Sequence, residues 1–347
     1  MPSTPNENHQ KTPASSESSR SSVSLGDRLK SPRTLVSFAL AAAFIIFVFR
    51  NLDLNVSEIA DNIASGNPFW IGLGFLAYYG AFPIRSWRWR KLMESAGIYK
   101  RGEHLPVYSI GSLSEIFVLS WFANCLVPAK LGDAYRGYLL RARAGVSFAS
   151  TLGTIVAERF IDVFALVGLM VAAALLTFHG DVPEDVQLPL VGGGVLVLVG
   201  LVGLAFVARY RSALLKLVPE RFSAPVDRLQ GGVLSSFARQ GWVPVTAATA
   251  VIWATEGLRV YCVAAAFDVQ LSAPEAIFVA LLASLLTVIP LTPAGLGVVE
   301  SGTIIALKLL DVTDTDAATI ALVDRGIAYW SVIVVGAVLW IVVRRRG

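Results

Sequence analysis

Acidic and basic side chains stand next to each other at two places inside long apolar stretches of this sequence. Glu158 precedes Arg159, and Asp324 precedes Arg325. An ionised group in bilayer hydrocarbon costs about 2.5 to 3.5 kcal/mol on insertion scales, so such groups are expected to face a protein interior or a polar path. A guanidinium can hold a phosphate with two parallel hydrogen bonds, while nearby carboxylates keep the empty site neutral. The pairs therefore either bind an anionic group or lock helices together.

Further ionisable groups lie in the same apolar stretches. Arg159 with Asp162, and Glu256 with Arg259, are three residues apart and can meet on one helix face. We interpret four arginines as candidate phosphate contacts: Arg136, Arg159, Arg259 and Arg325. Lys130 would attract the anion, and five carboxylates would balance the charge: Asp133, Glu158, Glu256, Glu300 and Asp324. The remaining candidate binding positions are Asn124, Pro128, Gly132, Asp162, Pro293, Gly295 and Gly297.

A five-residue motif occurs twice, as Pro-Ala-Lys-Leu-Gly at 128–132 and as Pro-Ala-Gly-Leu-Gly at 293–297. Proline removes a backbone donor and glycine permits conformations closed to other residues, so the motif is predicted to interrupt a helix. An interrupted helix at membrane depth is tolerated only where protein or a watery cavity surrounds it. The returning helices, starting near Asp133 and Val298, would direct their N-termini at an anion. A kink that serves packing alone is the alternative.

The composition is that of a polytopic membrane protein. The chain has 347 residues, 55% hydrophobic and 16% charged, and a mean hydropathy of +0.63. Six apolar runs can each cross a hydrocarbon core of about 30 Å as a helix: 34–49, 68–84, 146–178, 187–209, 242–267 and 317–343. Two more runs, at 105–127 and 271–289, lead into the repeated motif. Hydropathy thus gives about eight segments.

The distribution of charge predicts the topology. The positive-inside rule places four Lys- and Arg-rich segments in the cytoplasm: 1–33, 85–104, 209–240 and 344–346. Four connections contain no Lys or Arg and are expected on the outer side: 51–67, 179–186, 267–273 and 311–316. The segments 105–143 and 271–310 each begin and end on one side, so each is predicted to enter the membrane and return.

We therefore expect an all-α membrane protein with about six full spans and two re-entrant hairpins, arranged as an inverted repeat. The first repeat would occupy 34–178 and the second, of opposite orientation, 187–343. A disordered tail at 1–33 and a short end at 344–347 would both be cytoplasmic. The predicted location is the inner or plasma membrane.

The sequence gives little sign of a cofactor, a metal or a nucleic-acid partner. The histidines, His9, His104 and His179, lie in the tail or in loops and are not spaced as a metal site. The formal net charge of +4 comes from basic residues beside apolar runs, which serve topology. Cys125 and Cys262 lie in apolar segments, where they are expected to pack. Without a nucleotide-binding or catalytic motif, we expect no enzyme activity.

A basic and aromatic segment ends the run at 68–84, with Arg85, Arg88, Arg90 and Lys91 interleaved with Trp87 and Trp89. Such a composition is typical of an anchor at the membrane interface. A collecting site for anionic lipid is the alternative interpretation. Arg85 is the expected counterpart of Arg259 in the second half.

At these residues the sequence resembles the flippase-like integral membrane family that includes the transmembrane region of lysylphosphatidylglycerol synthases. The resemblance covers roughly 34–343 and rests on Asn124, Pro128, Ala129, Gly132, Asp133, Arg136, Glu158, Arg159, Asp162, Pro290, Pro293, Gly295, Gly297, Glu300, Asp324 and Arg325. In those synthases a C-terminal soluble domain transfers an aminoacyl group from tRNA to a lipid, and the membrane region moves the product across the bilayer. Because this sequence ends at Gly347, directly after a span, the resemblance implies the translocating part alone.

Three hypotheses follow. The first is a translocase that moves a lipid with an anionic head group, either a phospholipid or a polyprenyl-phosphate-linked lipid, between leaflets. The second is a secondary transporter of a small anion with the same broken helices. The third is a membrane scaffold for a separate synthase or glycosyltransferase, in which the intramembrane charges are purely structural. The energy source and the oligomeric state are not specified by the sequence.

Overall fold

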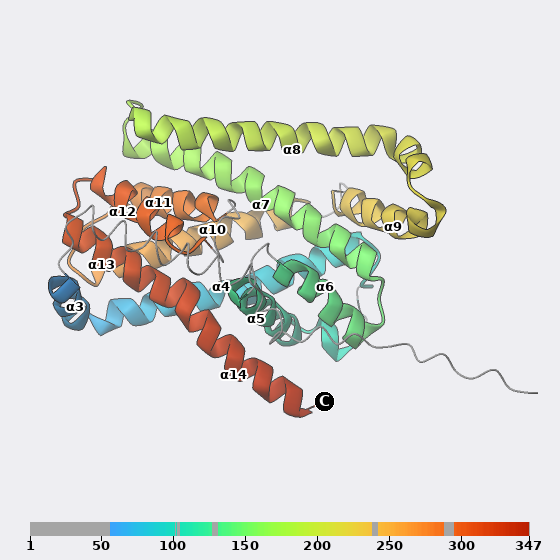
Figure 1. Cartoon of the computed structure of the whole chain (residues 1–347), viewed down its shortest axis with the longest axis horizontal. Helices are drawn as coiled ribbons and strands as arrows, with labels where there is room; N and C mark the ends of the chain where they lie inside the picture. The colour runs from blue at the N-terminus through green and yellow to red at the C-terminus, as the bar shows by residue number, and fades with distance from the viewer. Residues whose placement is uncertain are drawn as a thin grey trace, which may run out of the picture.

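A computed structural model of the chain describes residues 56–100, 102, 105–126, 131–237, 242–287 and 295–346. Every regular element in this part of the chain is helical (Figure 1), which confirms the all-α class. The predicted tail at 1–33, the predicted first span at 34–49 and the tips of both predicted hairpins lie outside the described residues.

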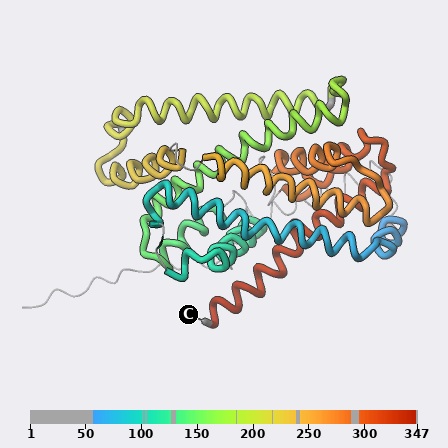
Figure 2. The backbone as a smooth tube through the Cα atoms, turned by 180° about the vertical axis from the view of Figure 1, so that it is seen from behind, coloured from blue at the N-terminus to red at the C-terminus, as the bar shows by residue number. Residues whose placement is uncertain are grey.

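Two antiparallel helices form the centre of the fold, α4 (Pro68–Ser95) and α10 (Trp242–Ala265). Figure 2 shows them side by side, α4 in blue and α10 in orange. Proline suits the first turn of α4, where its missing N–H would have had no partner, and the Asn67 side chain caps the same helix by accepting a hydrogen bond from Phe69 N. Pro83 lies inside α4 without ending it.

Each predicted hairpin is a pair of helices that pack against each other. The first consists of α5 (Ile110–Leu126) and α6 (Leu131–Ala144), preceded by the short 3-10 helix η1 (Pro106–Tyr108). The second consists of α11 (Ala273–Leu286) and α12 (Val298–Lys308). In the first hairpin, Leu131 and Gly132 at the end of the repeated motif already belong to α6, and in the second hairpin the motif ends directly before α12. The other residues of the first motif, and Pro293 and Ala294 of the second, lie outside the described residues, so the helix breaks expected there stay predictions.

The hairpins exchange partners between the halves of the chain. Helix α5 packs against α14 (Ser331–Arg346), the last helix of the second half, and α11 packs against α7 (Phe148–Thr177), the last helix of the first half. A short π-helix, η3 (Gly326–Trp330), joins α13 (Asp314–Arg325) to α14. Reciprocal contacts around the α4–α10 pair are the pattern expected of an inverted repeat. The exact boundaries of the two repeats stay a prediction.

Three helical stretches among the described residues are long and apolar enough to cross a membrane: Phe148–Thr177, Val186–Lys216 and Asp314–Arg345. Helices α4 and α10 have 28 and 24 residues. Each of these two predicted spans is long enough for a bilayer core of about 30 Å. They carry buried charged side chains, which lower their hydropathy. Five of the six predicted spans are thus helices of membrane-crossing length.

Helix α8 (Glu184–Leu217) lies along one side of the molecule (Figure 1). It leaves large apolar side chains such as Leu188, Val191 and Leu198 exposed, as a lipid-facing helix does. Two segments between the predicted spans, 51–67 and 209–240, contain helices, α3 (Val56–Ser65) and α9 (Glu220–Ser236). Both have the polar, amphipathic composition that a search for apolar runs passes over.

Candidate functional site

The predicted ionisable residues of the first half that the structure describes gather in one largely buried group, which we call the first cluster. It contains three arginines and three carboxylates: Arg88, Arg136, Arg159, Asp133, Glu158 and Asp162. Glu158 of α7 is the centre, because its Oε1 lies 2.9 Å from Arg88 Nη2 of α4 and its Oε2 lies 2.8 Å from Arg136 Nη2 of α6. Arg88 also contacts Asp162, with Nη1 at 2.5 Å from Oδ1.

Arg159 lies at the margin of the first cluster. Its Nη2 and Nε donate to the two carboxylate oxygens of Asp133 at 2.7 and 2.9 Å, the bidentate geometry that a phosphate would also satisfy. A longer contact of 3.6 Å joins Arg159 Nη1 to Asp162 Oδ2, so the predicted pair three residues apart does meet. The Arg159 side chain is 40% exposed and that of Asp133 17%. The first cluster is therefore open on this side.

The second half contains a matching group, the second cluster. It also has three arginines and three carboxylates: Arg85, Arg259, Arg325, Glu256, Glu300 and Asp324. Arg259 of α10 donates from Nε to Asp324 Oδ1 of α13 at 2.6 Å and also pairs with Glu256 on its own helix. Arg85 of α4 reaches Glu256 at 2.7 Å. No side chain of the second cluster is more than 10% exposed.

The two clusters are built on the same plan. In each, the acidic-Arg pair of the last span meets an arginine of the central helix and a carboxylate in the first turn of the returning hairpin helix. Arg325 Nε donates to Glu300 Oε1 at 2.9 Å, as Arg159 does to Asp133. Each cluster combines equal numbers of cations and carboxylates. This balance removes the unpaired charge that hydrocarbon would penalise most.

The structure corrects the interpretation of Arg85 and Arg88 as parts of an interfacial anchor. Both are buried, with 5% and 0% exposure, and each contributes to a cluster. Arg88, rather than Arg85, is the counterpart of Arg259, because each of these two arginines binds the carboxylate of the acidic-Arg pair in its own half. Their spacing was a signal that could have been used, since Arg85 and Arg88 are three residues apart, as are Glu256 and Arg259. The outer residues of the segment do remain near the surface: Arg90 donates to the Tyr108 carbonyl, and Lys91 pairs with Glu94.

Aromatic rings and one hydroxyl complete the surroundings of the buried guanidinium groups. The Arg136 guanidinium carbon lies 4.6 Å from the Trp89 ring centre and 4.4 Å from that of Phe117. Arg88 Nη1 donates to Thr249 Oγ1 of α10 at 2.8 Å, which ties the first cluster to the second half. Within the described part of the chain, the Nε atoms of Arg88 and Arg136 have no hydrogen-bond partner. The site therefore holds buried donors beyond those that its carboxylates satisfy.

Gly132 explains how the first hairpin closes. Its amide donates to Asn124 Oδ1 at 2.7 Å and its carbonyl accepts from Ser120 Oγ at 2.7 Å, so two polar residues of α5 hold the first turn of α6. A Cβ at position 132 would lie 2.0 Å from the Ser120 carbonyl oxygen. Only glycine allows this approach, and the approach brings Asp133 to Arg159.

The second hairpin reaches a similar result by backbone conformation. Gly295 and Gly297 have φ angles of 73° and 84°, values that disfavour any residue with a Cβ. Glu300 Oε2 accepts a hydrogen bond from Gly297 N at 2.7 Å, which starts α12 and leaves Oε1 for Arg325. The glycines of the second motif thus place Glu300 as Gly132 places Asp133.

The start of one hairpin tip lies beside the cluster of the other half. Tyr329 of η3 donates to the carbonyl of Cys125, the next-to-last residue of α5, at 3.1 Å. The same ring lies 5.1 Å from the Arg325 guanidinium carbon. Pro128, Lys130 and Pro293 lie outside the described residues, so the anion contacts expected at these positions stay predictions.

No group of His, Cys, Asp and Glu in the described ranges is arranged to hold a metal ion. Both cysteines that the sequence analysis assigned to packing, Cys125 and Cys262, are buried and free. The functional side chains that the structure brings together are guanidinium and carboxylate groups.

Comparison with known proteins identifies the family. Residues 34–336 match the family described as the lysylphosphatidylglycerol synthase TM region. The chain belongs to this family. A UPF0104 membrane protein of Methanocaldococcus jannaschii is 34% identical over 226 residues, which are 65% of this chain and 95% of that protein. A UPF0104 membrane protein of Methanothermobacter thermautotrophicus is 23% identical, over 86% of this chain and 90% of the relative.

A third relative differs in size. The glycosyltransferase AglD of Haloferax volcanii is 23% identical over 344 residues, which cover 88% of this chain but 54% of the relative. The match therefore spans about half the length of the glycosyltransferase. Together, the family match and the apolar helices establish that the chain is a membrane protein.

Proposed function

We propose that this protein moves a lipid with an anionic head group between the leaflets of the inner or plasma membrane, with both chain termini in the cytoplasm. The observation that carries the proposal is the pair of buried, charge-balanced clusters at the hairpins of a membrane domain. Each cluster joins the first turn of a returning hairpin helix to the last span of its own half. A path between them would offer the head group polar partners while its apolar chains stay in the bilayer.

The physical argument begins with the cost of these groups. A buried ion pair adds little stability compared with well-packed apolar residues, and replacing it by such residues is often neutral. Helix packing alone therefore does not require two clusters with three arginines each at the hairpins. Guanidinium groups also have the geometry that binds phosphate with two hydrogen bonds.

Arg159 is the proposed first contact. It is the most exposed arginine of the two clusters, and it holds Asp133 through two hydrogen bonds. A phosphate that replaced Asp133 would find the same donors, and the released carboxylate would lie close enough to limit the change in net charge. The other arginines would then take over the phosphate in turn, with no enzyme step and no cofactor. Transport would be downhill, ion-coupled or driven by a partner.

The relatives suggest the class of lipid. The family takes its name from synthases of an aminoacylated phospholipid, and one relative is named as a glycosyltransferase. Phospholipids and polyprenyl-phosphate-linked sugars share a phosphate next to the apolar chain. We therefore propose that the site recognises this phosphate, and that a separate synthase or glycosyltransferase supplies the lipid.

A scaffold is the second candidate function, and the ion pairs themselves favour it. Every arginine of the two clusters has a carboxylate partner, as purely structural locks would. In that case the protein would recruit the separate lipid-modifying enzyme without moving lipid itself.

Reconstitution tests the proposal. The wild-type chain, Arg159→Gln, Arg325→Gln and the control Arg143→Gln are placed in liposomes with labelled phosphatidylglycerol or polyprenyl phosphate, and the rate of leaflet exchange is measured. Arg143 pairs with Glu115 outside both clusters, so its loss removes an ion pair of similar length. We expect slow exchange from the two cluster variants and wild-type exchange from the control. Equal rates from all four chains would exclude translocation through the clusters.

A further inference from the structure

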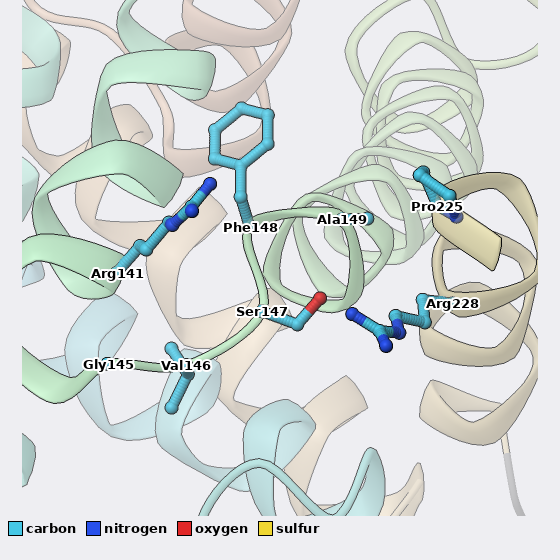
Figure 3. Close-up of a pocket in the computed structure, with 8 residues that line it drawn as sticks. All are labelled: Arg141, Gly145, Val146, Ser147, Phe148, Ala149, Pro225 and Arg228. Carbon is cyan, nitrogen blue, oxygen red and sulfur yellow. The ribbon is translucent and has the colours of Figure 1, made fainter. Parts of the chain in front are cut away.

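A pocket lies outside both clusters, between α6, α9 and the start of α7 (Figure 3). Its volume is about 440 Å³ and its lining consists of Arg141, Gly145, Val146, Ser147, Phe148, Ala149, Pro225 and Arg228. The lining has two arginines and no carboxylate. All three elements belong to the basic end of the molecule, which the charge rule assigns to the cytoplasm.

The two arginines of the pocket differ from their neighbours. Among the described residues Arg143 pairs with Glu115 and Arg211 with Asp227, whereas Arg141 and Arg228 have no ion-pair partner. Figure 3 shows Arg228 directed toward Ser147, with Arg141 on the other side of the connection. A pocket lined by two guanidinium groups and no carboxylate favours an anionic ligand.

Backbone contacts set the positions of the two helices that carry Arg141 and Arg228, whose side chains are exposed. Gly145, with φ of 69°, ends α6 by donating to the Arg141 carbonyl at 2.9 Å. On the other side, α9 approaches the backbone of α7 closely, because a Cβ on Gly232 would lie 2.5 Å from the Ser150 carbonyl oxygen. Arg228 is one helical turn before Gly232, so this contact sets its position over the pocket.

The start of α7 contributes donors to the same pocket. Ser147 caps the helix by accepting from Ser150 N, and its carbonyl accepts from Thr151 N. In the part of the chain that the structure describes, the amides of Phe148 and Ala149 have no partner within the helix, as expected for a first turn. These N–H groups and the positive end of a 30-residue helix add to the two guanidinium groups.

We propose that this pocket binds a phosphate group, and that the phosphate belongs to the head group of an anionic lipid in the leaflet at the basic end of the protein. The pocket would hold the lipid beside the helix that carries Glu158 and Arg159. The proposal does not depend on translocation, because a resident lipid can bind here whether or not the clusters move lipid.

Hydrogen–deuterium exchange of the full chain gives a local test. The chain is prepared in nanodiscs of phosphatidylcholine, with or without phosphatidylglycerol, and exchange is measured for the amides of 145–151. Three forms are compared: wild type, R141Q/R228Q, and R209Q/R221Q. The last removes two other exposed arginines, so both variants have the same net charge.

We expect phosphatidylglycerol to slow exchange at 148–150 in wild type and in R209Q/R221Q, and to have about tenfold less effect in R141Q/R228Q, since two charge-assisted contacts are lost. Inorganic phosphate added to phosphatidylcholine nanodiscs distinguishes a lipid head group from a soluble phosphate compound as the ligand. Protection by lipid alone identifies a lipid site, and protection by phosphate that depends on the same arginines identifies a soluble phosphate compound. No protection in any form, or equal protection in both variants, would overturn the proposal.

Discussion

The two clusters use the same kinds of contact but differ in access and in backbone. The first cluster is open at Arg159, whose side chain is 40% exposed, whereas no side chain of the second exceeds 10%. Helix α7 continues regularly past its acidic-Arg pair, but the second pair is followed directly by the π-helix η3. One plan thus gives an accessible cluster in the first half and a closed one in the second. The difference supports the proposal that a head group enters at Arg159. The second cluster would then be a later step of the path or serve mainly to hold the helices together.

The largest expected difference concerns the central carboxylates. Among the described residues, Glu158 is the one carboxylate that pairs with Arg136 and one of two that pair with Arg88, so Glu158→Gln leaves unpaired charge in a buried place. We expect a loss of about 3 to 5 kcal/mol in unfolding free energy. Asp324→Asn leaves Arg259 with Glu256 and is expected to cost about half as much. Denaturant titration in detergent measures both free energies of unfolding. Equal losses would contradict the idea that Glu158, which pairs with two arginines, matters more to its cluster than Asp324 does to the second cluster.

The next comparison concerns two glycines of the hairpins. Gly132→Ala places a Cβ 2.0 Å from a backbone oxygen of α5, while Gly302→Ala places one 2.0 Å from Leu286 Cδ1, the end of a flexible side chain. Overpacking costs about 1 to 3 kcal/mol, and we expect Gly132→Ala near the upper limit and Gly302→Ala near the lower. Thermal unfolding distinguishes them. Similar melting temperatures would show that α5 and α6 can separate without loss.

The last comparison concerns the arginines of the two acidic-Arg pairs. Arg159→Gln should reduce unfolding free energy by about 1 kcal/mol, because a partly exposed ion pair is weak. Arg325→Gln removes a buried partner of Glu300 and should cost about 3 kcal/mol. If Arg159→Gln were the more destabilising of the two, the accessible cluster would be the structural one.

Much of this arrangement follows from local sequence. Long apolar runs predict α4, α7, α8 and α10, and the repeated motif predicts where the returning helix of each hairpin, α6 or α12, begins. The i, i+3 pairs also follow from helix geometry, as Glu256 and Arg259 show. These features depend on residues that are close in the chain.

The rest depends on contacts between distant segments. Arg88 binds Glu158 from 70 positions away, and Arg85 binds Glu256 from 171 positions away. Local sequence does not show such partners, and the neighbouring tryptophans predicted an anchor at the membrane interface instead. The amphipathic helix α9 lacks an apolar run, and the π-helix η3 lies inside the predicted run 317–343, where hydropathy does not distinguish it from an α-helix. The phosphate pocket depends on the Gly153–Gly232 contact between α7 and α9, which periodicity does not reveal.

Replacing the open ion pair by apolar residues tests the central claim most directly. D133L/R159L removes one carboxylate and one guanidinium together, so the first cluster keeps two arginines and two carboxylates, and stability should change little. The matched control is E115L/R143L, which removes a peripheral pair of 2.5 Å. The measurement is lipid exchange in liposomes, with the melting temperature of each chain recorded. We expect D133L/R159L to stay folded and to exchange lipid at least about tenfold more slowly than the control. A folded D133L/R159L that exchanges lipid as fast as the control would contradict a head-group path through Arg159.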